Sequence, residues 1–378
     1  TSVASIWGAL TSGRPLHIVS EAERFDIDKL QAKLYQPERY AVVYIPPALL
    51  KELDVSAQGE LIPRMVVSGE ATDADLIHSL VNRTQLFNEY GPTENSVCST
   101  VHRYEKGDAA NVIGKPIAGV GYALLDDSYL PVPQGVKGRL YLSGAGVARG
   151  YVGKPELTKD KFRKLENSDT VYYDSCDVVR LNARGEIEFF GRSDNQVKIR
   201  GHRVELGEIE HCISRVSGVK SAKVLAEKND RSALVLSAYI QWDTSLKAMN
   251  SEMEPTQDVS AEFLFSVRNQ LEHTLPDYMM PSAWAFVDVW PLTPNGKIDQ
   301  TALPSAKPIQ RASHSLSSND AAQNSSPKTR VEQVIAEVWQ RLLGLENIDV
   351  NDNFFALGGD SIVAMQSVSR CSSEGVRY

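Results

Sequence analysis

The sequence predicts a multidomain protein of α/β and α+β subdomains that ends in a small helical bundle. Three observations lead to this prediction. Apolar strand-like runs alternate with helical stretches over 1–100, short β-rich runs punctuated by Gly and Pro follow over 110–190, and a linker at 305–327 precedes a new helical stripe. A chain of 378 residues has room for two or three domains of roughly 100–200 residues each.

The first hundred residues are expected to form a mostly parallel sheet. Residues 41–45, 64–68 and 85–87 read as strands, and residues 74–81 read as a helix with a polar face. Strands that alternate with helices favour parallel pairing, because each helix carries the chain back across the sheet.

The next two regions differ in pattern. Short β-rich runs over 110–190 predict a small β-barrel or an antiparallel sheet. Residues 195–304 read as a compact α+β unit. Its predicted elements are helices over 207–216 and 261–275 and strands over 222–226 and 233–240.

A flexible linker separates these regions from a helical domain. Residues 305–327 are rich in Ser, Asn, Ala and Pro and have no periodicity. After the linker, Thr329 and Glu332 have the spacing of a capping box, and a helical apolar stripe runs from Val331 to Leu343. The expected divisions of the chain are 1–192, 193–304, the linker 305–327, and 328–378.

Composition argues against several classes of function. A net charge of −8 and a pI of about 5.5 disfavour nucleic acid or an anionic membrane as the main partner. No apolar run is long enough to span a bilayer. The four cysteines lie far apart without a Cys-x-x-Cys pair, which gives no zinc signature and fits a reducing, cytoplasmic compartment.

The helical domain carries the strongest local motif. Residues 352–361 read DNFFALGGDS, in which aromatic residues can anchor the segment and two glycines give a turn free of side chains. Ser361 then opens an apolar-periodic helix, where backbone N–H groups and the helix dipole favour an anion such as a phosphodiester. The alternative is that Ser361 is a plain N-cap.

A second motif follows the predicted strand at 85–87. Residues 88–94 read NEYGPTE, and the Gly-Pro pair forces a loop at the carboxyl end of the sheet, where α/β proteins bind ligands. Tyr90 offers a flat face to a purine, Thr93 can donate to a phosphate, and Glu94 is a hard oxygen ligand for Mg²⁺. The alternative is a turn with polar surface residues.

These motifs resemble those of nonribosomal peptide synthetases. The letters YGPTE resemble the signature of adenylate-forming enzymes, and the segment that ends at Ser361 resembles the 4′-phosphopantetheine attachment site of carrier domains. Further segments that look like adenylation-domain motifs, in the same order, are 114–117, 138–151, 191–205 and 292–299. The resemblance implies an adenylate-forming fold. Its parts are a large-subdomain portion at 1–192, a lid subdomain at 193–304 and a truncated peptidyl carrier at 328–378.

The resemblance also implies a two-step ligase reaction in nonribosomal peptide synthesis. ATP and an amino acid give an aminoacyl adenylate, and a pantetheine thiol on Ser361 then takes the aminoacyl group as a thioester. The implied cofactors are ATP, Mg²⁺ and 4′-phosphopantetheine. The implied partners are the amino acid, a phosphopantetheinyl transferase, and neighbouring condensation or other synthetase domains.

The same resemblance assigns residues to roles. Lys297 is implied as the catalytic cation at the carboxylate and α-phosphate, Glu94 as the Mg²⁺ ligand, and Asp194 as the hinge of the lid subdomain. The implied nucleotide-binding residues are Asn88, Tyr90, Thr93, Asp177 and Arg192. The implied amino-acid pocket consists of Thr1, Ala4, Tyr44, Val66, Ser68, Glu89, Val97 and Cys98. Its carboxylate, Glu89, suits an aromatic, hydrogen-bonding or cationic side chain, unless it points at the backbone.

The ribose motif departs from the family pattern. Residues 173–177 read YDSCD, where the family usually has Y-R-T-G-D. Cys176 puts a Cβ where a tight turn needs positive φ, and Asp174 reverses a charge near the nucleotide. Both changes are expected to weaken ATP binding, so Cys176→Gly is expected to alter ATP–pyrophosphate exchange.

The resemblance also indicates that the chain is a piece of a longer protein. The phosphate loop of the family is expected upstream of Thr1, and a carrier domain normally continues beyond Tyr378. The isolated piece is therefore expected to be inactive. Two alternatives stay open: a degenerate adenylation scaffold with only the carrier functional, and an acyl-CoA ligase or reductase-type relative.

Overall fold

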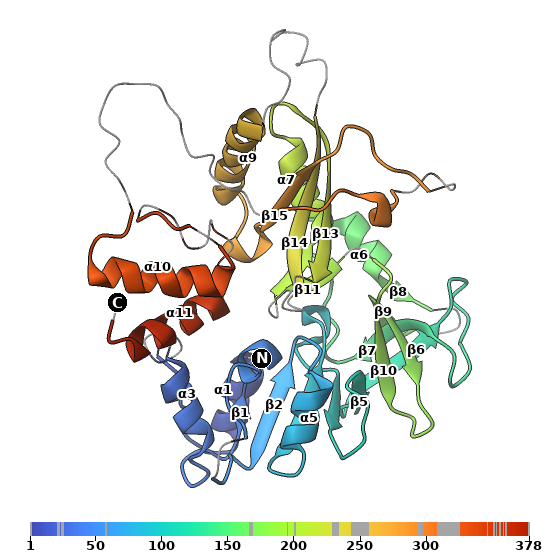
Figure 1. Cartoon of the computed structure of the whole chain (residues 1–378). Coiled ribbons are helices and arrows are strands. Elements are labelled where there is room, and N and C mark those ends of the chain that lie inside the picture. The colour runs from blue at the N-terminus through green and yellow to red at the C-terminus, as the bar shows by residue number, and fades with distance from the viewer. Residues whose placement is uncertain are drawn as a thin grey trace, which may run out of the picture. The chain divides into compact units, whose positions relative to one another are not determined.

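The computed structural model divides into two compact units, residues 1–202 and residues 203–378 (Figure 1). In the described part of the chain, no helix is long and apolar enough to cross a lipid bilayer. The residues that the structure describes are 2–20, 23, 26–56, 59–165, 169–194, 196–199, 202–228, 234–242, 257–293, 296, 298–307, 326–345, 347–350, 352, 354, 357, 359 and 361–376.

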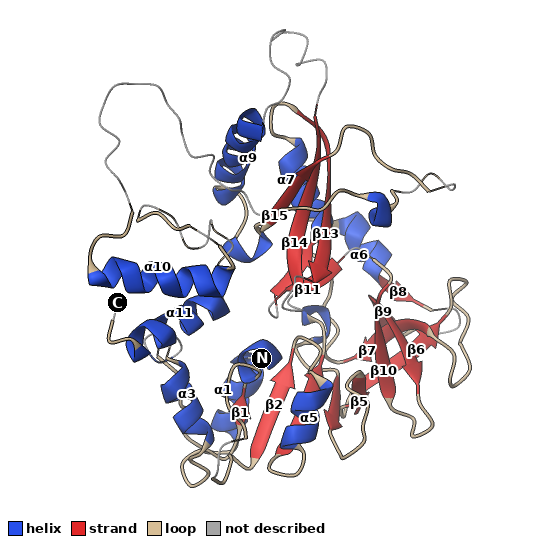
Figure 2. Ribbon diagram, viewed as in Figure 1, coloured by secondary structure: helices blue, strands red, loops and turns tan. Residues whose placement is uncertain are grey.

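One sheet organises the first unit (Figure 2). Its strands β1 (Val43–Tyr44), β2 (Arg64–Ser68) and β3 (Gln85–Tyr90) pair in parallel, which confirms the predicted parallel sheet. In-register pairing aligns the carboxyl ends of β2 and β3, so that Ser68 lies opposite Glu89.

Beyond β3 the sheet continues with antiparallel pairing. The strand order is β3-β4-β5-β10-β9-β7-β6, with β8 paired to β9. A small β-barrel or an antiparallel sheet was expected over 110–190, and the observed pairing is that of an antiparallel sheet. The strands are β4 (Thr100–Arg103), β5 (Val112–Pro116), β6 (Val120–Leu125), β7 (Gly138–Gly144), β8 (Phe162–Lys164), β9 (Val171–Leu181) and β10 (Ile187–Arg192).

Short helices complete the first unit. One of them, α5, confirms the helix predicted at 74–81. The Asp73 carboxylate caps this helix by accepting from the Asp75 N–H at 2.9 Å. The helices are α1 (Ser2–Thr11), α3 (Ile27–Leu34), α4 (Pro47–Leu50), α5 (Ala74–Leu80), α6 (Pro155–Lys161) and the 3-10 helix η1 (Thr93–Asn95). The chain then runs through β11 (Gln196–Ile199) and β12 (His202–Glu205).

The second unit begins with an α+β region that matches the prediction for 195–304. β13 pairs with β14 in antiparallel fashion, β14 pairs with β15 in parallel, and Val224 and Ile240 are fully buried between them and the helices. The elements are α7 (Leu206–Ser214), β13 (Val219–Lys228), β14 (Leu234–Trp242), α9 (Gln257–Glu272), η2 (Asp277–Met279), β15 (Ala283–Phe286) and η3 (Gln300–Ala302).

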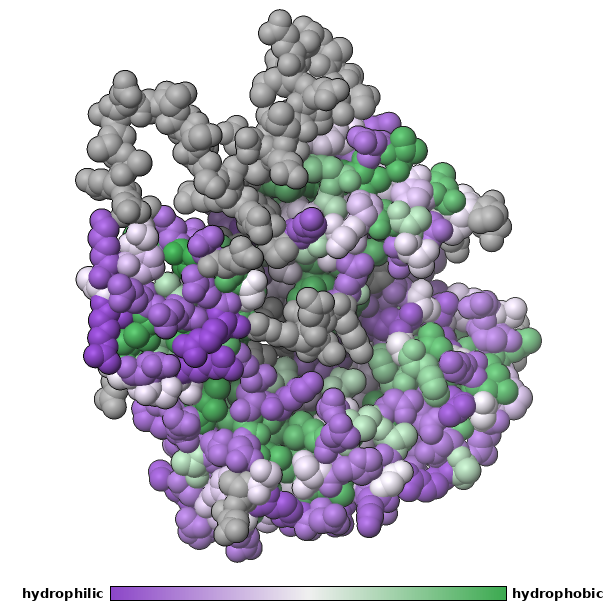
Figure 3. Space-filling view, viewed as in Figure 1, coloured by the Kyte–Doolittle hydropathy of each residue, from purple (hydrophilic) through white to green (hydrophobic). Residues whose placement is uncertain are grey.

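Two helices, α10 (Arg330–Leu343) and α11 (Ser361–Ser373), form the last described region. The predicted capping box is confirmed: the Thr329 hydroxyl accepts from the Glu332 N–H at 3.2 Å, and the Glu332 carboxylate accepts from the Thr329 N–H at 2.9 Å. Buried residues of both helices, with Val338 and Cys371 at 0% exposure, form a small core. The visible face of α10 is largely hydrophilic (Figure 3).

Phe354 anchors the turn before α11, as the sequence predicted. Its ring centroid lies 4.8 Å from that of Trp339, whose Nε1 donates to the Ser367 hydroxyl of α11 at 3.0 Å. The Gly359 N–H donates to the Phe354 carbonyl at 2.9 Å. A Cβ on Gly359 would overlap both the ring and the carbonyl of Phe354, so this turn requires glycine.

Gly359→Ala is therefore expected to loosen the turn and the start of α11. The added methyl must displace Phe354, and overpacking of this kind costs about 1–3 kcal/mol. Hydrogen–deuterium exchange of the full synthetase should show α11 amides exchanging at least about fivefold faster. Ser372→Ala, at an exposed position of the same helix, should leave exchange unchanged. Equal protection in both variants would contradict this account of the turn.

Candidate functional site

Three residues predicted to bind the nucleotide meet where the last residues of β3 and β10 approach the interior of β9. Tyr90, the last residue of β3, donates its hydroxyl to the carboxylate of Asp177 on β9. Asp177 lies opposite Arg192 on β10, and the Arg192 Nη1 is 2.8 Å from the Asp177 Oδ1. The fold thus joins residues that are 87 and 15 positions apart in the sequence.

Burial and the nearby positive charge shift the pKa of Asp177 in opposite directions. Its side chain is 6% exposed, and burial raises the pKa of the carboxyl, while the Arg192 guanidinium lowers it. Burial also raises the pKa of Tyr90 far above its usual range, so the phenol keeps its proton and donates it. Each Asp177 oxygen has lone pairs left for further donors, such as the hydroxyls of a ribose.

Arg192 also binds the predicted hinge residue. Its Nε and Nη2 lie 2.7 and 2.8 Å from the two carboxylate oxygens of Asp194, a bidentate pair. The Asp194 carboxylate accepts a further bond from the Gln196 N–H at 3.2 Å. Although burial acts to raise it, the pKa of Asp194 is lowered overall by Arg192. One guanidinium therefore connects the predicted ribose ligand with the predicted hinge.

Asn88 lies on the same face of β3 as Tyr90 but has its own partners. The side chain is buried, and its Nδ2 donates to the Tyr104 hydroxyl at 3.2 Å and to the Val112 carbonyl at 3.1 Å. These bonds connect β3 with β5. They support a structural role, and contact with a nucleotide stays a prediction for this residue.

The loop after β3 holds the other two polar residues of the motif. Thr93, the first residue of η1, is exposed. Glu94 is buried at 6% exposure, and its Oε1 accepts from the Tyr151 hydroxyl at 2.6 Å. The Glu94 carbonyl accepts from the Ala148 N–H at 2.8 Å. The sequence did not indicate Tyr151, which is 57 residues away from Glu94.

The backbone of this loop is unusual. Ser96 and Val97 have left-handed φ angles of 53° and 77°, a conformation that costs a β-branched residue about 1–3 kcal/mol. Gly91 packs so closely on the following chain that a Cβ there would overlap the Val97 carbonyl. Close packing against Gly91 therefore holds the strained segment that leads to Cys98.

Five of the eight predicted pocket residues lie around the ends of β1, β2 and β3. Tyr44 pairs with Val66, and Ser68 pairs with Glu89, so these four side chains share one face of the sheet. Burial raises the pKa of Glu89 and Tyr44, and burial followed by the charge of Glu89 raises the pKa of Cys98 to about 12. Glu89 also raises the pKa of Tyr44, which indicates that Tyr44, Glu89 and Cys98 are neighbours.

The remaining pocket residues are less informative. Ala4 is half-buried on α1, and Val97 lies in the strained loop. Thr1 lies outside the described residues, as does Lys297, the predicted catalytic residue. Around Lys297, an isolated antiparallel bridge joins Leu292 and Ile298. Ser361 is the first residue of α11, at the helix start that the sequence predicted.

The two departures in the ribose motif have different outcomes. Cys176 has φ of 59°, so the predicted positive φ is confirmed. Asp174 is buried, and its carboxylate lies 3.3 Å from Arg139 Nη1 and 3.2 Å from the Tyr141 hydroxyl. Arg139 therefore balances the reversed charge inside the sheet, and the weaker ATP binding expected from Asp174 stays a prediction.

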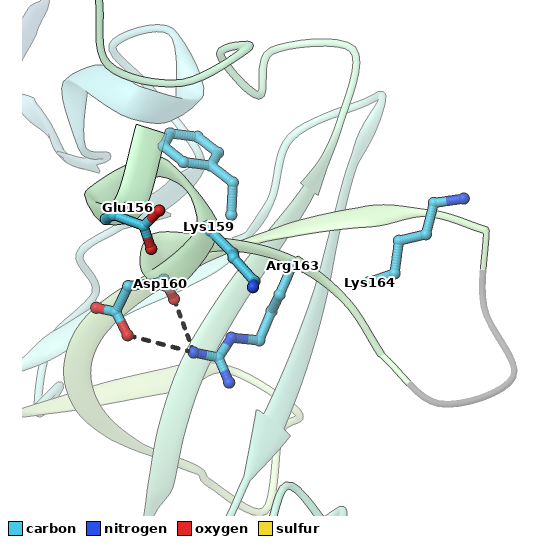
Figure 4. A pocket seen from close by; sticks show the side chains of 6 residues that line it. Glu156, Lys159, Asp160, Arg163 and Lys164 are labelled. Atoms are coloured by element: carbon cyan, nitrogen blue, oxygen red, sulfur yellow. Dashed lines mark hydrogen bonds and ion pairs between the residues drawn. The ribbon is translucent and has the colours of Figure 1, made fainter. Parts of the chain in front are cut away.

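Two open pockets of the described residues lie elsewhere. One is formed by α6 and β8 and lined by charged residues, among which Arg163 turns to Asp160 (Figure 4). The Arg163 Nη2 donates to the Asp160 carbonyl at 2.7 Å. Another surrounds His102, whose Nε2 lies 2.9 Å from the Asp108 carboxylate. Neither includes a predicted site residue; in the second, His102 and Arg184 pair with Asp108 and Glu186.

Comparison with known proteins agrees with the motifs. The AMP-binding enzyme family matches residues 1–152, and the phosphopantetheine attachment site family matches residues 333–377. Bacitracin synthase 3 of Bacillus licheniformis is 36% identical over 384 residues, which cover 99% of this chain and 6% of the synthase. Malpinin synthetase of Mortierella alpina is 35% identical over 385 residues, which cover 98% of this chain and 5% of the synthetase.

A solved structure has the same fold. The holo form of PA1221, described as an NRPS protein containing adenylation and PCP domains, aligns with a TM-score of 0.66 at 24% identity and covers 93% of this chain and 55% of that one. This chain thus spans less than a tenth of the two curated relatives and about half of PA1221. It belongs to the nonribosomal peptide synthetases and carries an adenylation domain segment followed by a phosphopantetheine carrier domain.

Proposed function

We propose that this segment, within the intact synthetase, activates an amino acid as an aminoacyl adenylate and loads it as a thioester on pantetheine at Ser361. The observation that carries the proposal is the buried Tyr90–Asp177–Arg192 cluster that joins β3, β9 and β10. It supplies a buried, oriented carboxylate in a chain that also holds a carrier domain. A cytoplasmic location is proposed with it, because all four cysteines are free.

The roles proposed for the nucleotide site rest on these contacts for Tyr90, Asp177 and Arg192, and on the family resemblance for the other residues. Asp177 accepts the ribose hydroxyls, and Tyr90 and Arg192 hold its carboxylate in place. Exposed Thr93 donates to a phosphate. Lys297 stabilises the negative charge that develops at the α-phosphate as the amino-acid carboxylate attacks. Asp194 is the proposed hinge, and a phosphopantetheinyl transferase is the proposed partner that modifies Ser361.

The residues around Glu94 fit Mg²⁺ only if this one carboxylate shares the ion with substrate phosphates and water. In the described part of the chain, no group of three His, Cys, Asp or Glu side chains could hold a metal ion. Mg²⁺ is commonly held by one or two carboxylates together with substrate phosphates and water. Glu94 would be that carboxylate, with Tyr151 orienting it through the 2.6 Å hydrogen bond. The ion, when bound, would neutralise phosphate charge.

Asp177→Asn is expected to raise the KM for ATP in ATP–pyrophosphate exchange by the full synthetase. The amide loses charge-assisted acceptor bonds, each worth about 1.5–3 kcal/mol, so the increase should be at least about tenfold. Asp169→Asn removes a carboxylate that is fully exposed and should leave the KM unchanged. An unaltered KM in Asp177→Asn would contradict the assignment of the ribose ligand.

Ser361→Ala separates activation from loading. The wild-type synthetase, treated with a phosphopantetheinyl transferase, ATP and amino acids, should gain first the pantetheine mass and then an aminoacyl mass. In Ser361→Ala the peptide that contains residue 361 should gain neither, while the synthetase retains pyrophosphate exchange. Intact-protein mass spectrometry makes the measurement. A pantetheine mass without any aminoacyl mass would favour the alternative of a degenerate adenylation scaffold.

Glu89 is expected to restrict the substrate side chain. Its carboxylate is half-buried and has no hydrogen-bond or ion-pair partner among the described residues. A substrate that donates a hydrogen bond, such as tyrosine, tryptophan or a cationic amino acid, would compensate this burial. Glu89→Gln should lower kcat/KM for that amino acid by roughly tenfold or more.

The control for this prediction is the KM for ATP, which Glu89→Gln should leave within about twofold. The measurement is pyrophosphate exchange over a panel of amino acids. A wild-type enzyme that prefers an aliphatic amino acid, with equal preference in Glu89→Gln, would show that Glu89 does not select the substrate.

A further inference from the structure

Cys176 occupies a demanding position next to Asp177. It is 5% exposed and its φ of 59° lies in the left-handed region that favours glycine. Its backbone is fully engaged: the N–H donates to Asp174 Oδ1 at 2.9 Å, and the carbonyl accepts from the Ser193 N–H at 2.8 Å and hydroxyl at 3.0 Å. A side chain retained in such a conformation needs a compensating contact.

Lys161 provides that contact. Its Nζ lies 2.9 Å from the Cys176 Sγ, and its side chain is 25% exposed. Burial raises the pKa of the Cys176 thiol, although Lys161 lowers it, so the sulfur stays protonated. Burial lowers the pKa of Lys161, but the thiol and Asp174 raise it overall, so the ammonium stays charged. The contact is therefore a hydrogen bond from a cation to a neutral sulfur.

The fold fixes both ends of this contact. Lys161 ends α6, and the next residues form β8, which pairs with β9 from Phe162↔Tyr173 to Lys164↔Val171. Cys176 lies on β9 directly before Asp177, whose own N–H donates to the Ser175 hydroxyl at 3.1 Å. A change in the backbone angles of Cys176 would consequently turn the Asp177 carboxylate relative to Tyr90 and Arg192.

We propose that Lys161 and Cys176 are positioning residues for the nucleotide site: their ammonium–thiol contact holds the left-handed residue before Asp177 and so orients the carboxylate that accepts the ribose. This inference rests on the proposed function. It gives Cys176, which replaces the family's usual glycine, a role in orienting Asp177. The sequence alone had indicated only that this replacement weakens ATP binding. Among the described residues, Lys161 makes no hydrogen bond or ion pair with Tyr90 or Arg192, so it acts on the site through Cys176.

The test uses pyrophosphate exchange by the full synthetase. Lys161→Met and Cys176→Ala should each raise the KM for ATP roughly five- to twentyfold, while kcat and the KM for the amino acid stay within about twofold. The double variant should be no worse than the stronger single variant, because both remove one contact. Lys161→Arg keeps the cation and the donor, and it should restore the KM to within about threefold of wild type.

The matched control is Lys159→Met, which removes a lysine of the same helix that lines the open pocket instead. Its KM for ATP should equal that of wild type. An unchanged KM in Lys161→Met, additive effects in the double variant, or an equal effect of Lys159→Met would each overturn the proposal. No exchange by the wild-type synthetase with any amino acid would instead refute the proposed function, so the two failures are distinguishable.

Discussion

The pairing register of β9 and β10 is the constraint on which the site depends. It places Asp177 opposite Arg192, so that a buried carboxylate meets a guanidinium at 2.8 Å. A buried carboxylate without a partner costs several kcal/mol, on the order of 3–5 when one member of a buried pair is removed. A slip of one residue would move every side chain of the strand to the opposite face and leave that carboxylate unpaired.

Arg192 extends this dependence beyond the proposed nucleotide site. Its three nitrogens serve two carboxylates at once, Asp177 on one side and Asp194 on the other. A guanidinium shared in this way cannot follow one partner without weakening its bonds to the other, because its donors form a rigid planar fork. Movement of the backbone at Asp194 would therefore displace the Arg192 guanidinium and weaken its bond to Asp177.

Local pattern predicted the elements and suggested several candidate site residues. The positive φ of Cys176 was expected from the resemblance, because the family usually has glycine there. The strands of the parallel sheet and the capping box of Thr329 and Glu332 follow from residue type and spacing within a few positions. The partners of buried charges do not. Arg139 lies 35 residues from Asp174, and Tyr151 lies 57 residues from Glu94. Such contacts depend on strand register and on the path of the loops, which the hydrophobic pattern of the sequence does not predict.

The left-handed pair Ser96 and Val97 has a consequence for altering what the enzyme accepts. Cys98 follows this pair directly, and the conformation of both residues depends on close packing against Gly91. Exchanging the side chain at 97 would thus affect the backbone path as well as the lining of the proposed pocket. The segment from Gly91 to Ser99 is one structural unit, so replacing it whole preserves its packing better than a single substitution at the proposed pocket.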